Sequence, residues 1–307
     1  MQVKEAVEVF ELTTNNLSKE TQIWYHNKLK AFTQWCETEA IALEHITPQQ
    51  IKRYIGLLQE KINPQNGKPL TSDTVHGYAK VIKLFLAWCA QDDEFSEYIK
   101  SRTVKLISLP KVEVKVIETF TLDQIKALFS VCQNEYTPAL VKRDTAILAL
   151  LLDTGVRASE LCGLIIGNVF IAKDESYIKV LGKGKKEREI GLGDKARAEL
   201  HRYIRQYRKG ARPDEPVFLS RFNEPLTING LDQLLYRLRD WARLGSTKAG
   251  AHKFRHTFAV NYLLNGGDVY KLARLMGHTS VSTTERYVRS MKQRDARKGN
   301  SVLDSLI

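Results

Sequence analysis

The sequence predicts a mostly α-helical protein of the α+β class, built as two domains with one small β-hairpin or sheet. Apolar residues recur at helical spacing behind capping sequences in the first hundred residues. The second half combines further helical patterns with two short alternating strands around a tip rich in glycine and lysine. A length of 307 residues is sufficient for two domains, and a hydrophobic content of 43% is ordinary for packed cores.

The N-terminal domain, residues 1–108, is expected to be a helical bundle, and no catalytic constellation is visible in it. Its helices are recognised by capping residues followed by apolar positions at helical spacing. The expected helices start at Ser18, at the capping box Thr47-Pro48-Gln49-Gln50 and at Thr71 or Ser72, with a short fourth helix around Phe95 to Ile99.

Residues 109–118 read as an extended linker, because charged and β-branched residues alternate there behind a proline. The second domain, residues 119–290, opens with the capping box Thr121-Leu122-Asp123-Gln124. A basic and then apolar tail, 291–307, ends the chain. The elements expected between are an apolar helix at 146–152 broken by Thr154-Gly155, hairpin strands at 176–181 and 187–192, and helices at 194–208 and 228–243.

The positive charge of the chain is segregated. The formal net charge is +12, and the first 110 residues hold 13 basic and 13 acidic residues, whereas 34 of the 47 basic and 22 of the 35 acidic residues follow. Clustered Lys and Arg are favoured by phosphate neutralisation. The leading inference is a nucleic-acid partner, since a charge that served only solubility would not need to be segregated.

The sequence also indicates the cellular compartment of the protein. The N-terminus lacks a signal-peptide pattern, and no apolar run approaches the length of a membrane span. The four cysteines are widely spaced and form no zinc-type cluster, which suggests buried free thiols. We therefore expect a cytoplasmic, nucleoid-associated protein with no membrane contact.

An arginine directly after the apolar helix is unusual. Arg157 follows the break at Thr154-Gly155, and an unpaired guanidinium away from water is costly. Glu160, three residues on, can hold it on the same helical face. A simple structural ion pair is the interpretation that these two residues favour by themselves.

Two further sets of cations are candidates for binding DNA. The hairpin tip, Gly182 to Lys186, is basic and is not a phosphate-cradling P-loop, while an arginine-studded helix face follows later. Tip lysines also discourage aggregation, and such helix faces are usually only solvated. The candidates are Lys185, Lys186, Arg237, Arg239 and Arg243.

The spacing of His252 and His256 raises the question of a zinc site. A zinc-protease helix carries glutamate directly after the first histidine, and Lys253 occupies that position here. We therefore expect no metal. His252, Arg255 and His256 share one face of a helix.

A stretch near the C-terminus joins a histidine to a tyrosine at fixed distance. A helix is expected to end at Gly277, and a second to begin at Ser282 with a capping box to Glu285. Tyr287 then lies within two turns of that helix, close to His278. Taken alone, both side chains fit ordinary packing roles.

Together these groups suit the chemistry of a phosphodiester. A phenol that attacks phosphorus creates negative charge on the non-bridging oxygens, which two arginines can clamp and imidazoles can share. A lysine on the hairpin tip can protonate the leaving 5′-oxygen. Because tyrosine is a poor nucleophile at its ordinary pKa, a strongly cationic pocket that favours phenolate is expected.

Four motifs, in order and spacing, resemble the active-site motifs of the tyrosine recombinase (phage integrase) family. The resemblance covers the whole catalytic half, and the N-terminal bundle resembles the family's core-binding domain. The layout is similar to the simple two-domain Xer or Cre plan. The motifs are Ala149 to Leu161, Gly182 to Arg188, His252 to Ala259, and Leu275 to Tyr287.

The resemblance implies a role for each residue. Arg157 and Arg255 would clamp the scissile phosphate, with Glu160 orienting Arg157. Tyr287 would form the 3′-phosphotyrosyl bond. His278 would donate a hydrogen bond to the phosphate, Lys183 would protonate the leaving 5′-hydroxyl, His252 would act as acid, base or donor near the nucleophile, and His256 would pack or support its helix.

The implied activity is site-specific recombination of double-stranded DNA at inverted repeats, through a Holliday junction and without ATP or any cofactor. The implied assembly is a homotetramer, or a heterotetramer with a paralogue, whose tails dock on neighbouring protomers; a frayed tail fits nearly as well. Mobile-element and host roles are not separated. Two alternatives stay open: a catalytically silent DNA-binding or regulatory protein, and a topoisomerase-like nicking–closing enzyme.

Overall fold

The computed structural model describes every residue except 65, 114–116, 173–174, 183–186, 279 and 292–307. The chain divides into two compact units, Met1–Val114 and Lys115–Ile307, and each has its own hydrophobic core. Lys183, Lys185 and Lys186 at the hairpin tip lie outside the described residues, as does nearly all of the predicted tail.

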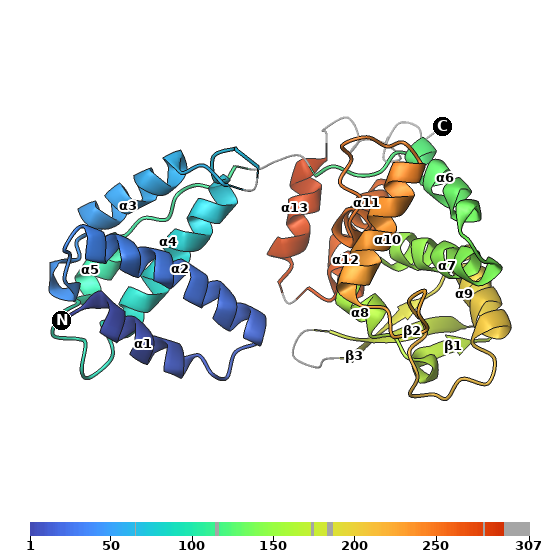
Figure 1. Cartoon of the computed structure of the whole chain (residues 1–307), viewed down its shortest axis with the longest axis horizontal. Coiled ribbons are helices and arrows are strands. Elements are labelled where there is room, and N and C mark those ends of the chain that lie inside the picture. The colour runs from blue at the N-terminus through green and yellow to red at the C-terminus, as the bar shows by residue number, and fades with distance from the viewer. Residues whose placement is uncertain (65, 114–116, 173–174, 183–186, 279, 292–307) are drawn as a thin grey trace, which may run out of the picture. The chain divides into compact units, whose positions relative to one another are not determined.

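The first unit is a helical bundle (Figure 1), and its hydrophobic core includes buried aromatic side chains. Phe32 and Phe85 are fully buried in it. The predicted caps are confirmed, because the side chains of Ser18, Thr47 and Thr71 each accept a backbone N–H of the first turn. Its helices are α1 (Val3–Thr13), α2 (Lys19–Thr38), α3 (Pro48–Glu60), α4 (Ser72–Cys89) and α5 (Ser101–Leu106), with a 3-10 turn at Leu43–His45.

Two features of this unit differ from the prediction. Helix α1 was not predicted, although Val3, Ala6, Val7 and Phe10 are buried at helical spacing. The short helix expected around Phe95 to Ile99 is wrong: those residues form consecutive turns, and the last helix, α5, begins at Ser101. The apolar residues Phe95 and Ile99 are buried as a helix would bury them, which explains the error.

The second unit is mostly helical with one small sheet, so the predicted fold class is confirmed. Helix α7 packs against α9 and α11. The helices are α6 (Leu122–Val131), α7 (Pro138–Thr154), α8 (Ala158–Cys162), α9 (Asp194–Tyr207), α10 (Ile228–Trp241), α11 (Ala251–Leu264), α12 (Val269–Met276) and α13 (Ser282–Ser290), with 3-10 turns at Cys132–Asn134 and Ile166–Asn168.

The sheet contains the predicted hairpin and one further strand. Strands β1 (Val169–Ile171), β2 (Ser176–Leu181) and β3 (Glu187–Gly191) are antiparallel in the order β1-β2-β3. Ile178 pairs with Ile190 and Val180 with Arg188, so these four side chains lie on one face of the sheet. Because the face is buried at Ile178, Val180 and Ile190, Arg188 is a charge on the core side.

Two left-handed glycines end the helices that frame the site. Gly155 terminates α7 with φ 60°, at the predicted break of the apolar helix, and Gly277 terminates α12 with φ 63°, as predicted for its C-cap. Helix α13 begins at Ser282 as expected, but the predicted capping box is wrong. Ser280 accepts from the Ser282 N–H instead, and Glu285 pairs with Arg289.

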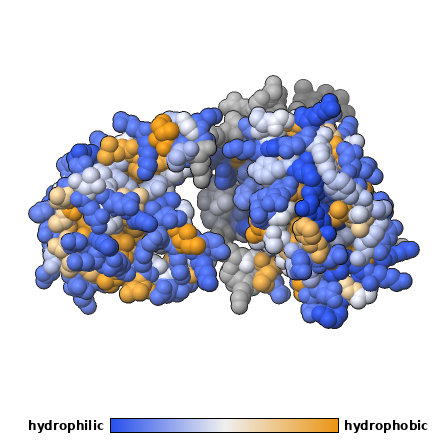
Figure 2. All heavy atoms as spheres, in the orientation of Figure 1, coloured by the Kyte–Doolittle hydropathy of each residue, from blue (hydrophilic) through white to orange (hydrophobic). Residues whose placement is uncertain are grey.

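The surface of the second unit is largely hydrophilic on the face that Figure 2 shows. The four cysteines are free, and Cys36, Cys89 and Cys132 are buried. None of the helices in the described ranges combines the length and hydropathy of a membrane span. Likewise, no three His, Cys, Asp or Glu side chains among the described residues are grouped as metal ligands.

Candidate active site

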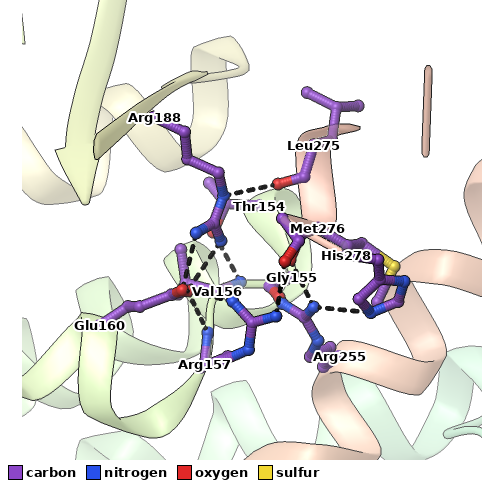
Figure 3. Close-up of polar contacts among 11 residues, drawn as sticks. Thr154, Gly155, Val156, Arg157, Glu160, Arg188, Arg255, Leu275, Met276 and His278 are labelled. Carbon is purple, nitrogen blue, oxygen red and sulfur yellow. Dashed lines mark hydrogen bonds and ion pairs between the residues drawn. The ribbon is translucent and has the colours of Figure 1, made fainter. Parts of the chain in front are cut away.

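One buried carboxylate organises the site. Glu160 of α8 accepts the Arg157 backbone N–H at 2.8 Å and its Nη1 at 2.6 Å, and it accepts Nη1 and Nη2 of Arg188 at 2.6 and 2.7 Å (Figure 3). Burial raises the pKa of a carboxyl group, but these bonds outweigh it and hold the Glu160 pKa at about 2. Glu160 is therefore a fixed anion between two guanidinium groups.

Arg157 caps the start of α8 and reaches the end of α12. Its Nη2 donates to the carbonyl oxygen of Gly277 at 2.8 Å. The side chain is 30% exposed, so the guanidinium is open to solvent on one side while Glu160 orients it on the other. Both the ion pair read from the sequence and the orienting contact implied by the resemblance are present.

Arg255 of α11 lies beside Arg157 and is buried. Its Nη1 donates to the Gly155 carbonyl at 2.6 Å, and its Nη2 donates to the Met276 carbonyl at 2.6 Å. Burial, together with the charge of Arg157, lowers the Arg255 pKa to about 10, which still leaves it protonated at neutral pH. The two arginines thus bind the carbonyl ends of α7 and α12, where cations are favoured.

His278 is held between Arg255 and α13. Its Nε2 lies 3.0 Å from Nη2 of Arg255, and its Nδ1 lies 2.7 Å from Oγ1 of Thr284. Because a guanidinium only donates, Nε2 accepts and Nδ1 carries the proton. Burial and the charge of Arg255 lower the His278 pKa to about 4, so the ring is neutral at pH 7.

Tyr287 is buried on α13 and packs against Ala259, Leu272 and Met276 of the two preceding helices. The expectation that the surrounding cations favour phenolate is wrong. Burial raises the Tyr287 pKa, and the opposing charges of Arg255, Arg286 and Arg157 do not reverse that effect. The phenol is neutral.

The histidine that reaches Tyr287 is His256. Its Nδ1 lies 3.0 Å from the phenol oxygen, whereas the sequence assigned His256 a packing role. His252, one turn earlier on α11, is exposed, and its ring centroid is 6.3 Å from that of His256. The helical spacing placed both residues on one face without showing which of them contacts the tyrosine.

Arg188 is a residue of this site that sequence reasoning missed. In addition to its two bonds with Glu160, its Nε donates to the Leu275 carbonyl at 3.0 Å, so β3 is joined to α8 and α12. A Cβ atom added to Gly277 would lie 2.9 Å from Nη1 of Arg188. The available signal was the alternation of β3, which places this charge on the same face as the buried Ile190.

The three arginines predicted to bind DNA differ in their surroundings. Arg237 on α10 pairs with the buried carboxylates Glu135 and Asp144, so internal partners balance its charge. Arg239 pairs with the neighbouring Asp240 and lies over the Tyr236 ring. Arg243 is exposed.

The arrangement suits an anionic tetrahedral group. Arg157 and Arg255 come from segments about a hundred residues apart and lie side by side, with His278 touching one of them (Figure 3). A phosphate beside the two guanidinium groups would receive charge-assisted hydrogen bonds. Through the contact of His278 with Thr284, the helix that carries the buried tyrosine is joined to the same cluster, and a phenol is chemically able to attack such a group.

Residues 118–294, which contain all of these groups, match the phage integrase family. The chain is 30% identical to tyrosine recombinase XerC of Leptospira interrogans over 91% of its own length and 86% of the relative. It is 31% identical to XerC of Staphylococcus haemolyticus, over 91% and 89%. The chain belongs to the phage integrase family of tyrosine recombinases. The family and enzyme class predicted from the sequence are thereby confirmed.

Solved structures of a site-specific recombinase and of an integrase share the fold. The post-cleavage complex of the XerH site-specific recombinase with palindromic difH substrate aligns with a TM-score of 0.75, at 18% identity over 97% of this chain and 84% of that one. A lambda integrase dimer bound to a COC' core site aligns with a TM-score of 0.66, at 18% identity over 92% and 97%.

Proposed function

We propose that this tyrosine recombinase cleaves and rejoins double-stranded DNA at specific sites, with Tyr287 as the nucleophile. The observation that carries the proposal is the single cluster formed by Arg157, Arg255, His278 and the α13 helix that holds Tyr287. These groups are separated in sequence, and their convergence supports a site in which the charges of Arg157 and Arg255 act on a buried phenol.

In the proposed step, the phenol oxygen of Tyr287 bonds to phosphorus as the bond from phosphorus to the 5′-oxygen breaks. Arg157 and Arg255 stabilise the negative charge that develops on the non-bridging oxygens. Their bonds to backbone carbonyls fix both guanidinium groups before DNA arrives, and preorganised donors lose little free energy by reorienting.

The remaining roles are carried over from the family pattern. Lys183 protonates the leaving 5′-oxygen, and Lys185 and Lys186 contact the DNA backbone from the same hairpin tip. His252 acts as acid, base or donor near the nucleophile. His278 donates to the phosphate once its Nε2 is protonated, because in the free chain that nitrogen accepts from Arg255.

The phosphotyrosyl bond conserves the energy of the phosphodiester, so strand exchange through a Holliday junction needs no ATP or cofactor. The partners are two DNA duplexes with inverted-repeat sites. Residues 1–108 act as the core-binding domain, joined by the 109–118 linker to the catalytic domain, 119–290. The assembly is a homotetramer, or a heterotetramer with a paralogue, in which tails 291–307 dock in trans. We place the enzyme in the cytoplasm, with the nucleoid, in a mobile-element or host role.

A nicked suicide substrate tests the nucleophile. Tyr287→Phe is expected to retain DNA binding and to form no covalent protein–DNA adduct, whereas the unmodified chain accumulates one. Adducts formed by the phenylalanine variant would assign the nucleophile elsewhere. A silent DNA-binding protein gives no adduct in either form, and a nicking–closing enzyme forms adducts but reseals the strands without exchange.

A bridging 5′-thiolate substrate tests Lys183, because a thiolate leaves without needing a proton. Lys183→Ala is expected to slow cleavage of the ordinary 5′-oxygen by about 10²-fold or more and to have much less effect on the thiolate. Equal losses on the two substrates would remove Lys183 from the general-acid role.

A further inference from the structure

The buried phenol of Tyr287 must lose a proton when it attacks. Burial raises its pKa, so the hydroxyl is protonated at neutral pH before the reaction. A neutral phenol is a weak nucleophile, and the proton has to pass to an acceptor within hydrogen-bond reach as the new bond forms.

The hydrogen bonds of the described residues place one ring nitrogen at that distance. Nδ1 of His256 lies 3.0 Å from the phenol oxygen, and the two rings meet edge to face with centroids 5.5 Å apart. Both nitrogens of His278 are engaged, one by Arg255 and one by Thr284. His252 is exposed, its ring centroid lies 6.3 Å from that of His256, and no hydrogen bond of the described residues joins it to Tyr287.

We propose that His256 is a catalytic residue that binds the Tyr287 hydroxyl through Nδ1 and accepts its proton during attack on DNA. This inference rests on the proposed function, because it assumes that Tyr287 is the nucleophile. It changes the role that the sequence suggested for His256, which was to pack or support α11, and of the roles proposed for His252 it leaves that of a hydrogen-bond donor.

The step balances in both directions. In cleavage, the hydroxyl proton of Tyr287 moves to Nδ1 of His256, the oxygen–phosphorus bond forms, and the 5′-oxygen leaves with a proton from the general acid. In rejoining, the 5′-hydroxyl attacks phosphorus and returns its proton to that group. The phenol oxygen leaves and takes back the proton held by His256.

The surroundings of His256 keep its ring neutral, so that it can accept a proton. Burial lowers its pKa to about 4, and the cations Arg286 of α13 and Arg255 of α11 act in the same direction, as does His252. The ring is therefore neutral at pH 7, and with its hydrogen on Nε2 it leaves the Nδ1 lone pair for the phenol. A bound phosphate beside Arg255 would oppose these cations and make the imidazole a stronger base.

The chosen variant separates proton transfer from positioning. His256→Asn puts an amide where Nδ1 stands, so a hydrogen bond to the phenol remains possible while the basic nitrogen is lost. Single-turnover adduct formation on the suicide substrate is expected to fall by about 10² to 10⁴-fold, the range for general acid–base catalysis. A variant that cleaves within about threefold of the unmodified rate would overturn the proposal, since ~0.7 kcal/mol of barrier is too little for that role.

Replacement of Tyr287 by a fluorinated tyrosine whose phenol ionises near neutral pH supplies the decisive readout. If His256 accepts the proton, this replacement restores most of the cleavage lost in His256→Asn, because the nucleophile no longer needs a base. A folded, DNA-binding variant that stays slow with the fluorinated tyrosine would show a purely structural role and would also overturn the proposal.

His252→Asn is the matched comparison from the preceding turn of α11. The proposal requires rescue of His256→Asn by the fluorinated tyrosine, and it expects none for His252→Asn. Rescue confined to His252→Asn would instead assign the proton to that residue. If His256→Asn does not fold, His256→Gln takes its place. Its cleavage rates with tyrosine and with the fluorinated tyrosine at position 287 then show whether His256 accepts the proton. Tyr287→Phe in parallel distinguishes failure of the nucleophile assignment, since adducts in that variant refute the proposed function itself.

Discussion

Arg188 of β3 and Glu160 of α8 form a bidentate ion pair, with Nη1 to Oε1 at 2.6 Å and Nη2 to Oε2 at 2.7 Å. The Glu160 side chain is 1% exposed and that of Arg188 is 14% exposed. Since the same carboxylate orients Arg157, the strand that follows the hairpin tip is tied to the phosphate-binding arginine. The geometry of the site therefore depends on Arg188 as well as on the arginine pair Arg157 and Arg255.

Arg188→Gln should destabilise the second unit by about 3–5 kcal/mol, because it leaves Glu160 buried with one guanidinium instead of two. Urea denaturation followed by circular dichroism measures the loss, and hydrogen exchange of α8 and β3 assigns it to this unit. The control is Arg202→Gln, which removes an exposed pair with Glu199. That change should cost less than about 1 kcal/mol. Equal costs for the two variants would contradict the importance of the buried pair.

Gly277→Ala should cost more than an ordinary left-handed glycine replacement. Its φ of 63° alone disfavours a Cβ by about 1–2 kcal/mol. The new methyl would also lie 2.9 Å from the Arg188 guanidinium, which Glu160 and Leu275 hold in place. Gly245→Ala, at φ 58° with open space around it, measures the backbone cost alone.

The excess cost at Gly277 should disappear when Arg188 is already glutamine, because the fixed guanidinium is then absent. Unfolding free energies of the two single variants and the double variant test this coupling. An excess that persists in the double variant would mean that the strain arises elsewhere.

Local sequence signals predicted the starts of several helices, because capping is decided within four residues. Thr47 and Thr121 form the capping boxes expected of them. The box at Ser282 failed because the hydroxyl of Ser280, two residues earlier, takes the N–H of Ser282. Strand β1 escaped prediction since three residues are too few to show alternation.

The sequence predicted only part of the site, because contacts between distant segments depend on how the helices and strands pack. The resemblance named Arg157, Arg255, His278 and Tyr287, and the fold brings their segments together. Spacing along α11 could not decide whether His252 or His256 reaches the tyrosine, because that depends on how α13 packs. The Arg188 contact spans 28 residues of sequence, so no local pattern contains it.

The contribution of His256 and His278 to folding stability should fall as pH drops from 6.5 to about 4. Burial holds the pKa values of His256 and His278 near 4, below the ordinary 6.5. The unfolded chain therefore takes up these protons first, and stability that is fully present above pH 6.5 is lost as pH falls toward 4. Denaturation across this range measures the slope.

A chain with both His256→Asn and His278→Asn should lose much of that slope. The contribution of Glu160 lies lower, between its ordinary pKa of 4.5 and about 2, and should remain in the double variant. A slope that is unchanged between pH 6.5 and 4 would show that other groups titrate there.

Arg237 and Arg243 are both predicted to bind DNA. Their substitutions should differ in their effects on folding stability and on the salt dependence of DNA binding. Arg237→Gln removes a positive charge that balances Glu135 and Asp144, whose side chains are almost fully buried. This variant should lose several kcal/mol of folding stability and leave the slope of log binding constant against log salt unchanged.

Arg243→Gln, at an exposed position, should change folding stability by less than about 0.5 kcal/mol and reduce that slope by about 0.9, the value for one lost phosphate contact. Binding to an arbitrary duplex suffices, because the phosphate contribution does not depend on sequence. If Arg237→Gln reduces the slope as much as Arg243→Gln does, the guanidinium of Arg237 reaches a phosphate in spite of its two carboxylate partners, and its internal pairing is given up on DNA.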